Sequence, residues 1–166
     1  MILPIYTDKQ PVLHQEAAQI TEITPEIRQL ALDMRETLKG AVGIGLAAPQ
    51  VGKSVALIVI EIDEEENGGV PFMPLVNPRV TWKSPRQVEF IEACLSVPGV
   101  EANLRRPRKV RVKAQNLDGE RIEIDADGLL ARVLQHEIDH LHGILYTDLV
   151  PKKELKSRPL VQYPQL

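Results

Sequence analysis

The sequence predicts an α+β fold, because helical and strand patterns occupy separate stretches of a chain of 166 residues. Two stretches, 25–40 and 130–142, repeat apolar residues every three or four positions, as amphipathic helices do. Short runs rich in β-branched residues lie between them, and the last two runs flank a tight turn. The simplest organisation is one domain over residues 1–166, with an N-terminal helix and a second helix near the end.

The composition is that of an ordinary folded protein, with 43% hydrophobic and 26% charged residues. A net charge of −3 gives no reason to expect direct DNA binding through a basic surface. No apolar run approaches the ~18 residues of a membrane span, and Met1–Gln10 lacks the apolar core of a signal peptide. Cys94 is the only cysteine, so no internal disulfide can form and the cytoplasm is the expected location.

Signals at both ends mark the first helix. Thr24 is a suitable N-cap, Pro25 fits the first turn, and Gly40 ends the periodic pattern. Residues 1–23 are expected to be extended, apart from a short helix over residues 11–18. The expected apolar stripe of the main helix consists of Ile27, Leu30, Ala31, Met34 and Leu38.

Strands are expected through the middle of the chain. Residues 55–62 are nearly all aliphatic, which predicts a buried strand, and the acidic residues 63–69 predict a solvated loop. Shorter strands are expected around 74–80 and 87–91, separated by a turn at Ser84-Pro85.

A hairpin is predicted from two alternating segments, 109–114 and 122–126, with a tight turn at Asp118-Gly119. The tail after Tyr146 carries several basic residues and three prolines, so no long C-terminal helix is expected.

The segment Gly43–Gly52 is rich in small residues. Gly43 and Gly45 lie two apart, but the G-x-G-x-x-G spacing of a nucleotide loop is not met, and no phosphate-binding lysine motif follows. Small residues instead indicate that the backbone closely approaches another segment or a ligand.

The strongest chemical signal is the motif H-E-x-x-H at His136, Glu137 and His140. Histidines four apart on a helix lie one turn above each other and can bind one metal ion, with the glutamate placed as a general base. The alternative is three polar residues on an amphipathic helix, but this combination on a strongly helical stretch rarely arises by accident. Asp127 is a candidate cap and Gly143 a candidate stop for this helix.

A catalytic metal site needs three protein ligands and an open position. Cys94 is the candidate third ligand, the alternative being that it is a small buried hydrophobe. His142 points away from the other two histidines and is expected to be exposed.

Three motifs in the same order resemble those of peptide deformylases, from about residue 2 to residue 148. Gly43–Gln50 matches the family's first motif and His136–Gly143 its third motif. The second motif, usually E-G-C-L-S, is here Glu92-Ala93-Cys94-Leu95-Ser96, with alanine in place of glycine. The resemblance implies sheets, antiparallel or mixed, packed around a central metal-binding helix.

The resemblance also implies an activity: removal of the formyl group from the N-terminal formyl-methionine of new polypeptides by a metal-bound hydroxide. Cys94, His136 and His140 would hold one divalent ion, with Fe²⁺ expected and Zn²⁺ as the alternative. Glu137 would be the general base. The Gln50 amide and the Leu95 backbone N–H would stabilise the oxyanion.

A methionine pocket is implied around Ile44, Leu129 and Val133, with Ile44 and Gly45 pairing with the substrate backbone as an added strand. Ala93 would lie beside this groove, and Arg106 matches a family arginine expected to be structural. The implied partners are N-formylmethionyl nascent peptides, with a monomeric enzyme and ribosome association left open.

Two other classes of protein are alternatives to a deformylase. An H-E-x-x-H metallopeptidase would take its third ligand downstream of the helix, where Asp148 and Glu154 are weak candidates. A metal-binding protein with a structural or catalytically decayed site would typically close the site with four ligands, and only three are convincing.

Overall fold

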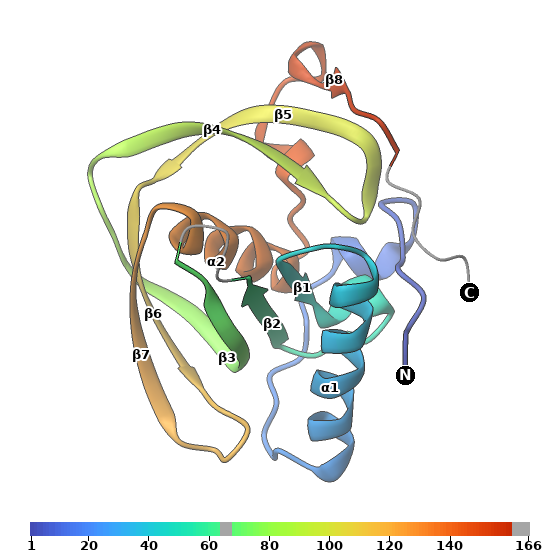
Figure 1. Cartoon of the computed structure of the whole chain (residues 1–166), viewed down its shortest axis with the longest axis vertical. Coiled ribbons are helices and arrows are strands. Elements are labelled where there is room, and N and C mark those ends of the chain that lie inside the picture. The colour runs from blue at the N-terminus through green and yellow to red at the C-terminus, as the bar shows by residue number, and fades with distance from the viewer. Residues whose placement is uncertain (64–67, 161–166) are drawn as a thin grey trace.

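In the computed structural model, which describes residues 1–63 and 68–160, helix α2 (Gly128–Leu141) lies at the centre with strands curving around it (Figure 1). Helix α1 (Pro25–Gly40) lies to one side of this assembly. The α+β architecture predicted from the sequence is confirmed. Much of the acidic loop expected over residues 63–69 lies outside the described residues. Within them, no helix is long and apolar enough to cross a membrane.

The strands form two sheets whose paired strands all run antiparallel. The larger sheet has the order β1-β2-β3-β6-β7 and the smaller one β4-β5-β8. The larger sheet consists of β1 (Gly45–Ala47), β2 (Leu57–Ile62), β3 (Val70–Lys83), β6 (Lys109–Gln115) and β7 (Arg121–Asp127). The smaller sheet consists of β4 (Gln87–Cys94), β5 (Val97–Pro107) and β8 (Lys156–Ser157).

Four short 3₁₀ helices lie outside these sheets among the described residues. They span Pro11–His14, Ala48–Val51, Tyr146–Leu149 and Lys152–Glu154. The first replaces the helix expected over 11–18. The last two contribute to the short, irregular course of the tail, where no long helix is present among the described residues, as expected.

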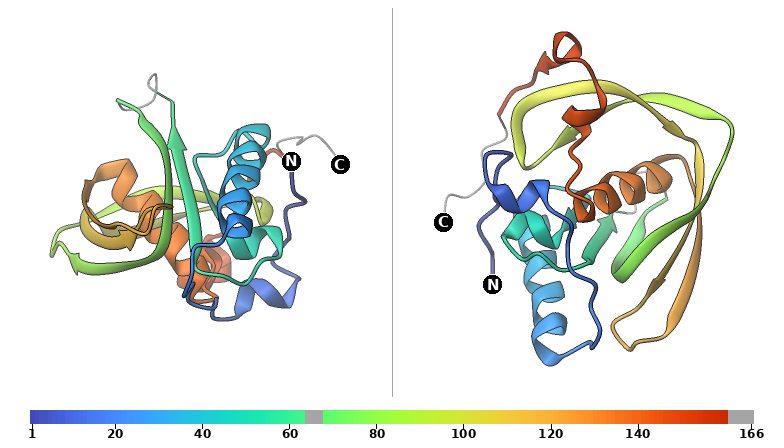
Figure 2. Two further views of the ribbon diagram at one scale, coloured as in Figure 1. Left: turned by 90° about the horizontal axis from the view of Figure 1, so that it is seen from below. Right: turned by 180° about the vertical axis from the view of Figure 1, so that it is seen from behind.

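Burial on both faces explains why the first four residues of β2, Leu57 to Ile60, are all aliphatic. Its alternate residues Ile58 and Ile60 pack in the core cluster that contains α2, whereas Leu57 and Val59 pack in the cluster that contains α1. A strand buried on both faces has no position for a solvated polar side chain. The two helices are thus on opposite faces of the same strand, and Figure 2 shows this arrangement from two further sides.

The helix caps are partly as predicted. The Thr24 side chain accepts a hydrogen bond from Ile27 N at 3.3 Å, as expected for an N-cap. Asp127 is the N-cap residue of α2, as predicted, but its side chain makes no capping hydrogen bond. Its carboxylate instead accepts from Arg108 Nε at 3.0 Å. Gly143 has φ +70°, in agreement with the predicted left-handed stop.

Strand lengths were less well predicted. Strands β6 and β7 form the expected hairpin, but β3 extends over 14 residues, well beyond 74–80. No strand was expected at β5, since Pro98, Gly99 and Pro107 break up its sequence. Proline and glycine disfavour strands locally, and the 3-stranded sheet overrides that preference through pairing with β4 and β8.

Candidate active site

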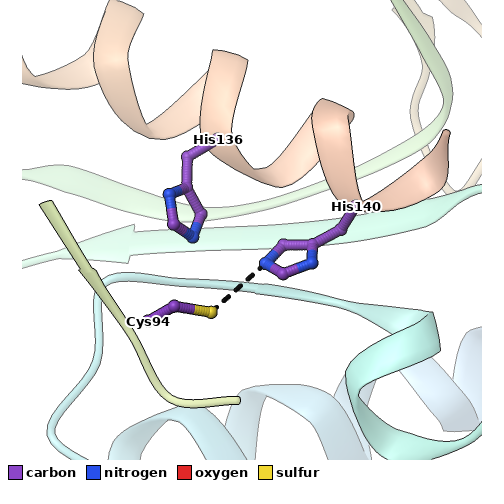
Figure 3. A group of neighbouring side chains, drawn as sticks. All are labelled: Cys94, His136 and His140. Atoms are coloured by element: carbon purple, nitrogen blue, oxygen red, sulfur yellow. Dashed lines mark hydrogen bonds between the residues drawn. The ribbon is translucent and has the colours of Figure 1, made fainter. Parts of the chain in front are cut away.

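Cys94, His136 and His140 meet in the interior between the two sheets. Figure 3 shows both histidines projecting from the same side of α2 toward the cysteine, which ends strand β4. The three ligand atoms lie within 4.8 Å of one another, and Cys94 Sγ is 3.4 Å from His140 Nε2. The i, i+4 spacing on one helix face therefore brings the two imidazoles together, and the tertiary fold supplies the thiol.

The end of β4 aims the cysteine into the site. Pairing between β4 and β5 shifts register between Glu92 and Cys94, which places Ala93 at an irregularity in the ladder. Such bulges redirect neighbouring side chains and are frequent beside active sites. Leu95 and Ser96 then form the tight turn into β5.

These donors fit a metal ion. A tetrahedral ion with Zn–S of ~2.3 Å and Zn–N of ~2.0–2.1 Å needs ligand atoms about 3.5 Å apart, close to the observed Cys94–His140 separation. His136 Nδ1 hydrogen-bonds to Glu92 Oε1 at 2.9 Å, which leaves its Nε2 for an ion. A carboxylate behind a ligating histidine is the usual arrangement of metal centres.

The charges around the histidines also suit a cation. Burial opposes protonation of His136, but the neighbouring Cys94 and Glu92 outweigh it and raise the pKa of His136 well above its ordinary value. The same two neighbours also favour a bound metal ion. Burial lowers the pKa of His140 far below its ordinary value and keeps that ring in the neutral form that ligates metals.

Glu137 is buried beside the donor cluster without belonging to it. Its Oε2 has no hydrogen-bond partner among the described residues. Burial raises the pKa of Glu137 to about 7. A carboxylate with a pKa near neutrality and a free oxygen is able to take and release a proton under physiological conditions.

Gln50 has a fixed orientation. Its Oε1 accepts from Ala47 N at 2.9 Å, so its Nε2 points the other way, toward Ser96 Oγ at 3.1 Å and Cys94 Sγ at 3.6 Å. The amide therefore presents its N–H donors to the donor cluster.

The two glycines of the first motif are explained by close packing. A Cβ on Gly43 would lie 2.9 Å from Leu38 Cδ1, and a Cβ on Gly45 would lie 2.8 Å from Val133 Cγ1 and 2.9 Å from Glu137 Oε1. The close approach predicted for this segment is thus made to other segments of the chain, and one of these contacts is with Glu137 itself.

A cavity of about 520 Å³ opens onto the cluster. Its wall includes Gln50, Leu95, Glu137 and two of the three donors, Cys94 and His136. Every residue expected to contact substrate also lines it. These are Ile44, Gly45, Ala93, Leu129 and Val133.

The structure also shows a buried network that the sequence analysis did not identify. Glu92 accepts from Arg106 Nε at 2.6 Å and Arg106 Nη2 at 3.0 Å, and from Arg132 Nη1 at 2.6 Å. Burial alone would raise the pKa of Glu92, but hydrogen bonds from His136 and Arg106 outweigh it and hold the pKa at about 2. The signal available in the sequence was Arg132 itself, a charge within the apolar run of the second helix.

Four other residues near the site or in the tail do not belong to the donor cluster. Tyr146 stacks on the His136 ring with centroids 6.0 Å apart. His142 is exposed, as expected, and pairs with Glu16. Of the downstream ligands considered for a metallopeptidase, Asp148 accepts from Leu145 N and Glu154 is exposed, and neither belongs to the donor cluster.

Three donors beside a cavity, with a buried acid next to them, are the arrangement of metal-dependent hydrolases. Within that class, the family model described as polypeptide deformylase matches residues 2–156, and the chain belongs to this family. It is therefore a hydrolase that removes the formyl group from N-terminal formyl-methionine. The resemblance inferred from the three motifs is confirmed.

Individual relatives agree with this assignment. A peptide deformylase of Acinetobacter baumannii (strain SDF) is 44% identical over 162 residues, covering 97% of this chain and 90% of its own. A peptide deformylase of Acidobacterium capsulatum is 47% identical over 146 residues, covering 88% and 85%.

Solved structures give the same result. The peptide deformylase of Ehrlichia chaffeensis superposes with a TM-score of 0.87 at 34% identity, covering 92% of this chain and 90% of that one. The enzyme of Synechococcus elongatus in complex with actinonin gives 0.85 at 39% identity, covering 91% and 80%.

Proposed function

We propose that Cys94, His136 and His140 hold the catalytic ion and that Glu137 is the general base of deformylation. The convergence of these three donors at one end of the cavity, two of them in its wall, beside a buried carboxylate with an unpaired oxygen, carries the proposal. A divalent ion in this position supplies a Lewis acid and lowers the pKa of a bound water toward ~7.

Glu137 moves the proton. With a pKa of about 7, its carboxylate takes a proton from the attacking water and returns it to the departing amine. No hydrogen bond from the described residues holds Oε2, so the carboxylate is not committed to another partner.

Gln50 and Leu95 stabilise the negative charge that develops on the formyl oxygen. The hydrogen bond from Ala47 N fixes the Gln50 amide so that Nε2 faces the cluster. Leu95 follows Cys94 directly in the tight turn and lines the same cavity, and its backbone N–H is the second proposed donor. A prepositioned donor of this kind contributes ~3–4 kcal/mol to the transition state in other acyl-transfer enzymes.

The cavity receives the first residue of the substrate. Ile44, Leu129 and Val133 form an apolar wall that suits the unbranched, flexible side chain of methionine. Gly45 belongs to β1, which pairs with β2 alone among the described strands, so its other edge is available to a peptide backbone. Ala93 contacts the substrate from the opposite strand, β4.

The proposed physiological metal is ferrous iron. One thiolate and two imidazoles bind zinc more tightly than iron by intrinsic affinity, whereas the family resemblance implies iron as the faster metal. Anaerobic loading with Fe²⁺ should give a clearly faster enzyme than loading with Zn²⁺, with activity lost in air as Cys94 oxidises. Equal rates for both forms, with an air-stable iron form, would exclude this assignment.

The proposal extends to the cellular setting. The substrates are nascent N-formylmethionyl peptides in the cytoplasm, and a monomer over residues 1–166 contains every residue of the site. Ribosome binding is testable by cosedimentation. In the described tail, 3₁₀ turns and β8 replace any long helix that could serve as a docking element.

The decisive variant is Glu137→Gln, which is nearly isosteric but cannot accept the proton. We expect it to bind one metal ion per chain and to lose formyl release from formyl-Met-Ala-Ser by roughly 100-fold or more. Metal content and formate production would be measured on the same preparation. Substantial activity with the metal fully bound would refute the general-base role.

A further inference from the structure

Arg132 is a buried charge on α2 to which neither the motifs nor the mechanism above assigns a role. It lies four residues before His136, and therefore one helical turn from it on the same face. Its exposed fraction is 9%, although most of its neighbours along the helix are apolar. A buried arginine needs partners, because desolvation of an unpaired guanidinium is costly.

Its partners lie on two strands of the smaller sheet. Arg132 Nη1 donates to Leu104 O of β5 at 3.0 Å, and Nη2 donates to Val88 O of β4 at 2.7 Å. Nη1 also donates to Glu92 Oε2 of β4 at 2.6 Å. One side chain thus ties the helix that carries both histidines to the strand that carries Cys94.

Glu92 links the Arg132 side chain to the metal donors through hydrogen bonds. Its Oε1 holds His136 Nδ1, while its Oε2 is held by both Arg132 and Arg106. Glu92 also precedes Cys94 by two residues on the same strand. A displacement of its carboxylate would therefore alter both the orientation of one ligand and the position of another.

We propose that Arg132 is a positioning residue of the metal centre, which acts through Glu92 to orient His136 and to hold Cys94 at ligating distance from α2. This inference rests on the donor set proposed above. Replacing a residue that hydrogen-bonds to a metal ligand typically weakens metal binding 10–100-fold. Because Arg106 also binds Glu92, removal of Arg132 leaves that carboxylate paired, so the fold survives while its position is less constrained.

A purely structural role is the competing explanation. Arg132 also lies 5.9 Å from the centre of the Phe90 ring and helps to line the cavity. In that case its loss would lower the melting temperature without changing metal affinity. The two explanations therefore differ in the dissociation constant for the ion.

The test compares Arg132→Met with Arg108→Met as a matched control. Arg108 pairs with Asp127 just before α2, is partly exposed, and is not among the residues that hydrogen-bond to Glu92. Zinc dissociation constants would be measured on metal-depleted protein by competition with a chromophoric chelator. We expect Arg132→Met to weaken zinc binding at least 10-fold and Arg108→Met to change it less than about 2-fold. The visible spectrum of the Co²⁺ form should change only in the first variant.

Coupling to Glu92 is tested by a double-mutant cycle. If Arg132 acts through Glu92, adding Arg132→Met to Glu92→Gln should weaken zinc binding much less than it does in the wild-type chain. Additive effects, or an unchanged zinc affinity in Arg132→Met with only a lower melting temperature, would overturn the proposal. Should Arg132→Met fail to fold, Arg132→Lys is judged by the same criteria, since lysine keeps the charge but cannot reach three acceptors at once.

Cys94→Ala separates this inference from the proposed function. Loss of stoichiometric zinc binding in that variant supports the donor set, and the Arg132 comparison then stands on its own. Wild-type zinc binding in Cys94→Ala would instead refute the donor set on which both rest.

Discussion

Gly45 of β1 lies so close to α2 that a Cβ would meet Val133 Cγ1 at 2.8 Å. Its backbone φ is not in the left-handed region, so alanine could adopt its conformation. The obstacle to the substitution is steric, because an added Cβ would clash with α2. Val133 is β-branched and rigid in a helix, so it cannot turn away from a new Cβ at 2.8 Å. We expect Gly45→Ala to destabilise the protein by ~1–3 kcal/mol and to displace Glu137, lowering kcat.

Gly40→Ala is the matched control for this prediction. A Cβ there would meet Ile2 Cδ1 at 3.5 Å, an ordinary contact at the end of α1. Urea unfolding and formyl release should leave this variant unchanged or slightly more stable, because alanine favours helix. If both variants behaved alike, close packing at Gly45 would not be the reason for the glycine.

Ala93 replaces a glycine of the family motif. Among described residues other than glycine, only Val42 and Asn77 have positive φ, so Ala93 has a backbone conformation open to any L residue. We therefore predict that Ala93→Gly changes kcat little and KM only modestly in a formyl-release assay. A hundredfold gain in kcat/KM, about 2.7 kcal/mol, would show instead that the alanine methyl obstructs the site.

At the scale of elements, Glu61 of β2 joins its strand to α1. Arg35 donates to both of its carboxylate oxygens at 2.7 Å, and Lys39 lies 3.4 Å away. The hydrogen bonds from Arg35 lower the pKa of Glu61 below 4.5. The stabilisation is thus present above pH 4.5 and is lost as the pH falls through the lower folded-state pKa.

We predict that Glu61→Gln lowers the urea midpoint at neutral pH and that this difference from wild type disappears in acid. The effect should be small, because the pair is partly exposed and screened by solvent. Glu123→Gln, which removes a half-exposed carboxylate from β7, is the control and should change the midpoint less. A difference for Glu61→Gln that persisted in acid would contradict the electrostatic explanation.

At the scale of the whole molecule, the proposed ion joins α2 to the end of β4. A ligand that binds only the folded state stabilises it by ~2.7 kcal/mol at 100 times its dissociation constant. For a chain of this length, that corresponds to a rise in Tm of roughly 5–10 °C. We expect this rise when zinc is added to metal-depleted protein, measured by calorimetry.

Cys94→Ala should lose most of that rise, because only two donors remain. Val88→Ala, at a partly exposed position of the same strand, should keep it. A full rise in Cys94→Ala would mean that zinc stabilises the fold from a different site.

The sequence by itself determined the parts of the protein that depend on local spacing. The i, i+4 histidines, the cap at Thr24, the β6–β7 hairpin and the family motifs are all encoded within a few neighbouring residues. The types of metal donor and the general base could be inferred in the same way, since residue chemistry does not require coordinates.

The tertiary structure alone decided how distant residues share one site. The hydrogen bonds of Glu92 to Arg132 and His136 join residues 40 and 44 positions apart, which no local pattern encodes. Strand β5 was missed for the same reason: pairing with β4 overrides its prolines and glycine. Asp127 has the residue type of a cap, but Arg108 lies close enough to bind its carboxylate. Long-range contacts have free energies as large as local preferences, and they become visible only once the chain is folded.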